Sequence, residues 1–484
     1  MISRQELLDL ATDFGLQPNV VEKDYALGWL LAAIGQHEAT RDTWVFKGGT
    51  CLKKCFFETY RFSEDLDFTL LDAGHLDEGF LRSLFQELGD WIYKETGLVL
   101  PPEARKFEVF TNPRGGTSAE GRVGYRGPLG RAGDTPRVKL DLTDHERLVL
   151  PVDRREVHHP YSDKPADGIQ ISSYCFEEVF AEKVRALAER LRPRDLYDVV
   201  HLYRRKELNP DRPRLMQSLE EKCAFKSIPV PTIEALRASP LVGELQVSWA
   251  QMLAHQLPQL PPFDAFWNEL PEVFSWLFGT AARPVLAASP AREAIDATWH
   301  VPAMAESWRG LGIAAPMEII RFAAANRLCV ELDYRKESGE QTRPVIEPYS
   351  LRRTMQGNFL LYGVKADTGE DRSYRVDRIH GATATGRAFT PKYIVELSDA
   401  GFMMAPPLVS RSSSSVGLGK AVTGRAPRAK TRVSKINGPT YFFRCSVCGK
   451  TFRRSSYDGA LNEHKGKNGW PCYGRIGTYV RTEY

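Results

Sequence analysis

The sequence predicts a mixed α+β protein that is divided into several domains, and three observations support this. The chain has 484 residues, more than one hydrophobic core ordinarily organises, so roughly two to four domains are expected. Segments with helical periodicity and segments with strand alternation are interleaved up to about residue 285. Short alternating runs separated by glycine-bearing turns dominate residues 328–397, which is typical of a small all-β domain.

The first hundred residues are predicted to contain four helices, two of them within residues 4–37, and two strands. Apolar residues at helical spacing indicate helices within residues 4–37. Residues 44–47 form a short apolar strand that leads into a glycine turn, and residues 50–60 are predicted to be helical. Residues 62–71 then alternate as a strand, and residues 76–97 return to helical periodicity.

The next part of the chain is predicted to change from strands to helices. Residues 98–150 alternate as β structure, and the run 137–143 places Lys139 and Asp141 on one face. Residues 175–191 form a strong helix that Pro193 interrupts, after which helical periodicity resumes. Residues 213–280 are mostly helical, so residues 1–285 are expected to form one mixed catalytic unit.

The C-terminal half has a different texture. A helix over 317–326 precedes alternating runs, and together they predict a small β-barrel over residues 310–400. The runs are 329–334, 359–364, 373–379 and 393–397. Residues 401–440 are rich in serine, glycine and basic residues and are expected to form a flexible linker, and 441–484 a compact module.

The net charge of +4 conceals a strong asymmetry. Residues 401–484 contain fifteen Lys and Arg against three Asp and Glu, a charge of +12, so residues 1–400 carry −8. A basic tail on an acidic body favours a polyanionic partner such as nucleic acid, and the alternative is a solvated linker. The chain shows neither a signal peptide nor an apolar run of membrane-spanning length, so a cytoplasmic protein without membrane contact is expected.

The most informative motif combines a glycine turn with two carboxylates. Gly48, Gly49 and Thr50 form a turn of small residues, where backbone N–H groups can approach phosphate oxygens. Asp65 and Asp67 follow on a strand, where residues two apart point to the same side. Paired carboxylate oxygens beside such a turn are typical of a site for Mg²⁺ and a nucleotide, with phosphoryl or nucleotidyl transfer as the chemistry.

Each part of this pattern has a simpler interpretation. An isolated Asp-x-Asp pair is usually polarity on an exposed strand, and the combination with the glycine turn and with Lys139-x-Asp141 argues for a site. Around Lys183 the simpler interpretation is a solvated helix with ion pairs from Arg185 to Glu182 and Glu189.

Five motifs, in order, resemble the AbiEii-type nucleotidyltransferase toxins of the polymerase-β-like superfamily. They cover about residues 1–285 and read VEKDY from 21, FKGGTCL from 46, RFSEDLDF from 61, KLDLT from 139 and EKVRAL…R…RDLYD over 182–198. The resemblance implies an Mg²⁺-dependent transfer of NMP from NTP to a tRNA 3′ end by a toxin of a toxin–antitoxin or anti-phage system, with a cognate antitoxin. Many relatives in the wider superfamily carry Ser where Thr50 keeps a hydroxyl.

The resemblance carries over residue by residue. The catalytic residues that it implies, with Asp65 and Asp67 as the ligands of Mg²⁺, are Asp65, Asp67, Asp141, Lys183 and Asp198. The nucleotide-binding residues expected from the turn, the strand faces and the family are Lys47, Gly48, Gly49, Thr50, Ser63 and Lys139.

The β-rich region resembles a WYL domain, an Sm/SH3-like barrel, through its pattern and not through the name-giving Trp-Tyr-Leu, which is Phe-Leu-Leu over 359–361 here. The resemblance implies sensing of nucleic acid or nucleotides. Arginine side chains fork onto phosphate and tyrosine stacks on bases, so the expected ligand contacts are Tyr334, Arg343, Arg375 and Arg378. An ordinary scaffold surface is the alternative.

The tail contains a set of residues typical of structural zinc sites. A Cys-x-x-Cys pair with a later His and Cys supplies four N/S ligands for tetrahedral Zn²⁺. They are Cys445, Cys448, His464 and Cys472. Basic and aromatic residues surround them, so Arg453 and Arg454 are expected to contact nucleic acid.

Together these observations predict a multidomain nucleotidyltransferase toxin. The alternative is a WYL-type sensor or regulator with an inactive transferase domain, although no helix-turn-helix precedes the barrel. A third class is an enzyme that modifies a protein or a small molecule.

Overall fold

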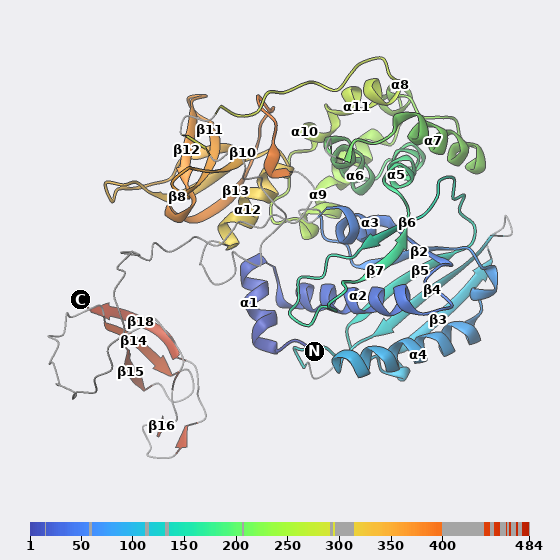
Figure 1. Cartoon of the computed structure of the whole chain (residues 1–484), viewed down its shortest axis with the longest axis horizontal. Coiled ribbons are helices and arrows are strands. Elements are labelled where there is room, and N and C mark those ends of the chain that lie inside the picture. The colour runs from blue at the N-terminus through green and yellow to red at the C-terminus, as the bar shows by residue number, and fades with distance from the viewer. Residues whose placement is uncertain are drawn as a thin grey trace, which may run out of the picture. The chain divides into compact units, whose positions relative to one another are not determined.

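The computed structural model describes most of the chain. The residues outside the description are 15, 58–60, 112–115, 131–134, 206–207, 291–293, 296–313, 399–439, 446–449, 455–460, 462–463, 466–470, 473–476 and 484. Two compact units are formed, Met1–Ser410 and Arg411–Tyr484, and each is described by itself (Figure 1).

A seven-stranded mixed sheet organises the N-terminal part of the first unit. Its strands are β1 (Trp44–Lys47), β2 (Asp65–Leu70), β3 (Arg105–Thr111), β4 (Thr117–Gly124), β5 (Arg137–Thr143), β6 (Asp153–Glu156) and β7 (Gln170–Ser173). The spatial order is β3-β4-β5-β2-β1-β7-β6. The central strand β2 pairs antiparallel with β1 and parallel with β5. This places the strand predicted to carry Asp65 and Asp67 in the middle of the sheet.

Helices cover this sheet because their apolar faces require burial. They are α2 (Pro18–Gln36) and α4 (Glu78–Thr96), and α1 (Arg4–Phe14) packs against α2. Helix α2 lies across the sheet in Figure 1, and its Trp29 packs against Trp91 of α4. Trp44 of β1 packs on Phe85 of α4. The ends of α4 follow capping rules, since the Asp77 carboxylate accepts from Phe80 N–H and Gly97 takes a left-handed φ of 78°.

A helical cluster completes the N-terminal part. It comprises α5 (Phe176–Arg190), α6 (Pro193–Arg204), α7 (Arg212–Lys226), α8 (Ile233–Arg237), α9 (Val242–Leu253), α10 (Phe263–Trp267) and α11 (Leu270–Leu277). Leu191 takes a left-handed conformation after α5, and Pro193 begins α6, so the predicted interruption is confirmed.

The helix predicted over 50–60 is irregular. Residues Gly48–Cys51 form α3, and Leu52–Phe56 continue as a π-helical turn. The helical segment therefore begins directly at the glycine pair, two residues earlier than predicted.

The second half of the first unit is a curled sheet that remains open. Helix α12 (Ala314–Ala325) precedes β8 (Leu328–Arg335), β9 (Gln341–Thr342), β10 (Val345–Arg353), β11 (Phe359–Lys365), β12 (Asp371–Arg375) and β13 (Ile379–Ala388). The strands follow the order β12-β11-β10-β8-β13, with β9 paired to β8, so β12 and β13 end the sheet and the predicted barrel is a half-barrel. The strand predicted over 393–397 is wrong, because Tyr393 makes an isolated bridge to Ala287 and Glu396–Ser398 form a 3-10 turn.

A buried polar joint attaches the half-barrel to helix α6. The Tyr197 hydroxyl donates to Asn326 Oδ1 at 2.9 Å, and His201 Nε2 lies 3.2 Å from the same oxygen. Beside it, Glu269 pairs with Arg204 and Arg327, at 2.8 Å in both cases. Helix α6 thus contacts the half-barrel through one side.

The second unit contains β14 (Thr440–Cys445), β15 (Thr451–Arg454) and β18 (Gly477–Glu483) in the order β15-β14-β18. A separate pair joins β16 (His464–Lys465) to β17 (Pro471–Cys472). The predicted linker falls almost entirely outside the described residues.

Candidate active site

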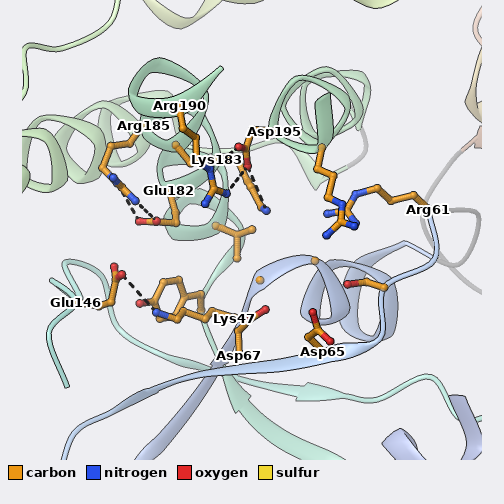
Figure 2. A pocket seen from close by; sticks show the side chains of 17 residues that line it. Lys47, Arg61, Asp65, Asp67, Glu146, Glu182, Lys183, Arg185, Arg190 and Asp195 are labelled. Atoms are coloured by element: carbon orange, nitrogen blue, oxygen red, sulfur yellow. Dashed lines mark hydrogen bonds and ion pairs between the residues drawn. The ribbon is translucent and has the colours of Figure 1, made fainter. Parts of the chain in front are cut away.

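A pocket of about 310 Å³ lies between the face of β2 and helices α5 and α6 (Figure 2). Asp65 and Asp67 rise from β2, and Lys183, Arg185 and Arg190 project from α5 on the opposite side. Its lining consists of Lys47, Gly48, Gly49, Arg61, Ser63, Asp65, Asp67, Glu146, Tyr174, Val179, Glu182, Lys183, Arg185, Ala186, Arg190, Arg194 and Asp195. The glycine turn, both predicted β2 carboxylates and Lys183 therefore meet at one place.

The two glycines of the turn are required by geometry. Gly48 has a φ of 81°, and a Cβ there would lie 2.1 Å from Asp67 Oδ2. A Cβ on Gly49 would lie 2.6 Å from Arg61 Nη2 and 3.0 Å from Ser63 Oγ. The turn is therefore narrow enough to bring backbone against the carboxylate and the guanidinium, which only glycine permits.

Asp65 and Asp67 of β2 both present their carboxylates to the pocket. Within the described residues, neither side chain makes a hydrogen bond or an ion pair. Burial raises the pKa of Asp67 to about 6, with Asp141 and Asp65 adding to the shift and Lys47 opposing it. Burial also raises the pKa of Asp65, against the attraction of Lys23 and Lys139. The site is thus arranged to receive positive charge.

Asp141 and Lys139 lie beside these carboxylates on β5. The parallel register pairs Asp67 with Asp141 and Asp65 with Lys139, so the shared face predicted from alternation is confirmed. Lys139 Nζ is 2.9 Å from Asp141 and 3.5 Å from Glu120, which together raise the pKa of Lys139 despite burial. Both side chains stand at the edge of the pocket and do not line it.

Asp198 is the centre of a buried ion-pair network. The Arg61 guanidinium donates to both of its oxygens, at 2.8 and 2.9 Å, and Lys183 Nζ lies 2.7 Å away. Burial alone would raise the pKa of Asp198, but Arg61 and Lys183 hold it well below its usual range. Its carboxylate is fully buried beneath the pocket wall. This geometry gives Asp198 a role in positioning Lys183 and Arg61.

Two neighbouring charged residues of α6, Asp195 and Arg194, differ in their partners. Asp195 receives two hydrogen bonds from Arg190, at 2.7 and 2.8 Å. Arg194 lines the pocket and, in the part of the chain that the structure describes, makes no ion pair. Burial lowers the pKa of Arg194, and the nearby Arg61 contributes in the same direction. Arg194 is therefore a cation available to an anionic ligand.

The opposite end of the pocket is closed by a second network (Figure 2). Glu182 pairs with Arg185 at 2.5 Å, and Arg185 also pairs with Glu189, as the helical spacing predicts. Burial would raise the pKa of Glu182, but Lys222 and Arg185 lower it to about 2. Lys47 Nζ lies 3.7 Å from Glu146.

Thr50 lies elsewhere than expected for a phosphate contact. It is fully buried, and its hydroxyl donates to the backbone carbonyl of Asp65 at 2.5 Å. Thr50 therefore fixes the start of β2 against α3 and does not line the pocket. Arg61, Glu146, Tyr174, Arg190 and Asp195 line the pocket but were not assigned to it from sequence.

The residues predicted to bind a ligand on the half-barrel are partly engaged with one another. Tyr334 accepts from the Arg375 backbone N–H at 3.4 Å, and the Arg375 guanidinium donates to Asp377 at 2.8 Å. Arg378 lies 3.5 Å from Glu337, and Arg343 is exposed. Their role in binding stays a prediction.

The zinc prediction falls largely outside what the structure describes. Cys445 is buried in β14 beside Leu461 and Phe452, whereas Cys448 lies outside the described residues. The backbone register places His464 opposite Cys472 in the β16–β17 pair. Arg453 and Arg454 lie on β15, opposite Phe442 and Tyr441.

The described residues contain neither a preformed metal-ligand cluster nor a helix suited to span a membrane. Among the described residues, no group of three or more His, Cys, Asp or Glu side chains is arranged to hold a metal ion. A metal at the β2 carboxylates would therefore need further ligands from its substrate. Within the same residues, no helix combines the length and apolar character that crossing a bilayer demands.

Two protein-family models match segments of the first unit. Residues 29–269 match the family model described as the nucleotidyl transferase AbiEii toxin of a type IV toxin–antitoxin system, and residues 317–384 match the WYL domain. The first unit thus carries an AbiEii-type nucleotidyltransferase domain followed by a WYL domain. No curated protein matches the chain.

Two solved structures are similar to parts of the chain. The nucleotidyltransferase toxin MenT4 from Mycobacterium tuberculosis is 19% identical over 58% of this chain and 91% of its own, with a TM-score of 0.40. The proteasome accessory factor PafBC of Arthrobacter aurescens is 13% identical over 63% of this chain and 41% of its own, with a TM-score of 0.15.

Proposed function

We propose that this chain, which carries an AbiEii-type nucleotidyltransferase domain, is a toxin of a toxin–antitoxin or anti-phage system that transfers NMP from an NTP to the 3′ end of an RNA, with tRNA as the first candidate. One observation carries the proposal. The uncompensated carboxylates of Asp65 and Asp67 face Lys183 and Arg194 across a pocket that begins at the glycine turn. Such a pocket is complementary to a triphosphate that arrives with a divalent cation.

The residues present fit Mg²⁺. Asp65 and Asp67 supply hard oxygen ligands, and burial raises the pKa values of both carboxyl groups. Mg²⁺ is commonly held by one or two carboxylates and completed by substrate phosphates and water, so the lack of a three-ligand cluster among the described residues agrees with this chemistry. When bound, Mg²⁺ would neutralise phosphate charge and lower the pKa of the attacking hydroxyl.

The protein's own groups supply the remaining functions. The N–H groups of Gly48 and Gly49 begin a helical segment and lack intrahelical acceptors, so they suit phosphate oxygens. Lys183 and Arg194 balance the charge of the phosphates, and Asp198 holds Lys183 in place. In the reaction, the 3′ oxygen of the acceptor forms a bond to the α-phosphorus while the bond to pyrophosphate breaks. Pyrophosphate leaves, and the hydroxyl proton passes to solvent.

The test is direct labelling. Purified full-length protein is incubated with total tRNA, Mg²⁺ and each α-³²P-labelled NTP in turn, beside Asp65→Ala. Asp42→Ala is the matched control, because its carboxylate is 70% exposed and pairs only with its neighbour Arg41 at the surface. Label on tRNA from the wild type and the control, but not from Asp65→Ala, would support the proposal. Label on protein alone, or equal labelling by Asp65→Ala, would refute it.

A second function is favoured by the WYL match. The half-barrel of residues 328–388 would then sense nucleic acid or a nucleotide, and the transferase domain would serve as a scaffold. Absence of transfer to any acceptor, together with nucleic-acid binding by the intact chain, would favour this alternative.

A further inference from the structure

An aromatic surface stands just outside the pocket, at the end marked by Glu146. Phe225, near the end of α7, is 40% exposed although its helix buries Leu215, Leu219 and Cys223. The His145 ring lies against it, with centroids 5.1 Å apart and planes at 51°. We call Phe225 and His145 the aromatic shelf.

The shelf is rigidly supported from below. The loop after β5 is tied to α7, because Lys222 Nζ donates to the Arg147 carbonyl at 2.8 Å. On its other side, His145 packs so closely on Gly116 that a Cβ there would lie 2.4 Å from His145 Cγ. A ring held on both sides loses little freedom when a ligand stacks on the shelf.

The shelf is continuous with the pocket through charged side chains. Lys226 Nζ lies 5.5 Å from the centroid of the Phe225 ring and 3.9 Å from Glu146. Glu146 lines the pocket and lies 3.7 Å from Lys47, at the end of β1. A molecule on the shelf therefore reaches the pocket at the end opposite Arg61, which Figure 2 shows on the far side of Asp67 from Glu146.

We propose that the aromatic shelf binds the 3′-terminal nucleotide of the RNA acceptor, with its base stacked on Phe225 and His145 and its phosphate beside Lys226. The inference rests on the proposed transfer reaction and assigns the two ends of the pocket. The NTP phosphates occupy the end with the glycine turn, Arg61 and Arg194, and the acceptor enters at the Glu146 end.

The chemistry of the shelf favours a nucleic-acid end over other acceptors. A base presents a flat π-face to aromatic rings whatever its sequence, and a flanking lysine suits the adjacent phosphate. A small-molecule acceptor would be enclosed by the pocket, whereas the shelf opens to solvent and leaves room for the rest of a long chain.

The test separates binding of the acceptor from binding of the NTP. Apparent KM values for total tRNA and for the labelled NTP are measured with full-length wild type, Phe225→Ala, Phe225→Trp and His145→Ala. Phe110→Ala is the matched control, since Phe110 is 55% exposed on β3 and lies outside the pocket. One stacked base is worth about 1–3 kcal/mol, so Phe225→Ala should raise the KM for tRNA roughly tenfold or more.

The other outcomes are equally decisive. The KM for the NTP should stay within about twofold of wild type, Phe225→Trp should restore the KM for tRNA, and Phe110→Ala should change neither. The inference is overturned if Phe225→Ala behaves like Phe110→Ala, or if it raises the KM for the NTP equally. If the wild type transfers NMP to tRNA and Phe225→Ala leaves the KM for tRNA unchanged, the role of the shelf is refuted and the proposed function stands. If the wild type transfers NMP to no RNA, both the proposed function and the role of the shelf are refuted.

Discussion

Two pairs of aspartates lie at the pocket, and they differ in whether a cation binds their carboxylates. Asp65 and Asp67 come from the sheet, and within the described residues their carboxylates have no cationic partner. Asp195 and Asp198 come from helix α6 and are each bound by arginine in a bidentate manner. Accordingly, burial raises the pKa of Asp67 to about 6, whereas Arg61 and Lys183 drive the pKa of Asp198 downward.

We propose that Asp65 and Asp67 serve a ligand, whereas Asp195 and Asp198 stabilise the fold. A buried carboxylate without a cation costs free energy, and the fold bears that cost at the place where a cation is expected to bind. A carboxylate with two cations is already neutralised and has little to offer a metal. Mutations of the two pairs should therefore have different consequences.

The largest expected effect is the loss of transfer in Asp67→Asn. Removing a ligand of the metal should lower the rate of NMP transfer by about a thousandfold or more. The melting temperature should stay equal or rise, because an uncompensated charge disappears. Labelling assays and thermal melts on the same preparation check both, and a variant that unfolds at lower temperature would break the comparison.

The next effect is the loss of stability in Asp198→Asn. The change leaves Arg61 and Lys183 buried without their shared anion, and breaking such a pair ordinarily costs about 3–5 kcal/mol. Urea denaturation of the wild type and Asp198→Asn would measure the difference in the free energy of unfolding. Asp42→Ala should lie within about 0.5 kcal/mol of wild type. If Asp198→Asn loses activity but keeps its stability, Asp198 would instead be assigned a role in binding the ligand.

A smaller effect should follow the addition of ligand. Mg²⁺ with an α,β-methylene NTP analogue at about a hundred times its Kd should stabilise the wild type by about 2.7 kcal/mol. Asp67→Asn should lose most of this stabilisation, since it lacks one metal ligand. Thermal melts with and without Mg²⁺ would reveal it. Stabilisation of both proteins to the same degree would show that Asp67 does not hold the metal.

The smallest expected effect is a change in the free energy of unfolding at acidic pH. The pKa of Asp198 is lowered by folding, so its ion pairs contribute stability that is fully present above the unfolded pKa of about 3.9 and is lost as pH falls below it. The difference in unfolding free energy between wild type and Asp198→Asn should therefore shrink below about pH 4. Denaturation series from pH 7 to pH 3 measure it, and a constant difference across this range would contradict the pairing.

The sequence predicted the local parts of this site well. Alternation was enough to place Asp65 and Asp67 on one face of their strand and Lys139 and Asp141 on one face of theirs, because strand periodicity is a local property, and the register then brings the two strands together. Helical spacing likewise predicted the pairs of Arg185. The family resemblance added Lys183 and Asp198, which a single sequence would not have selected.

The parts that sequence reasoning missed are those that depend on distant pairing. Arg61 reaches Asp198 across 137 positions, and no local pattern announces such a contact. The same holds for Glu146 and for the direction of Thr50, which turns inward because α3 begins at Gly48. The half-barrel is open because β12 and β13 end the sheet and do not pair with each other. Alternation within a strand does not specify which strands pair.

The buried joint at Asn326 bears on how such chains are assembled from exchangeable parts. The two family matches end at residue 269 and begin at residue 317, yet Tyr197 and His201 both contact Asn326, and Arg204 donates to the Ala325 carbonyl. A transferase domain cut at residue 269 would therefore lose the contacts that Tyr197, His201 and Arg204 of α6 make with Asn326 and Ala325. A different domain in place of the half-barrel would need polar groups that replace Asn326 beside Tyr197 and His201 and Arg327 beside Glu269.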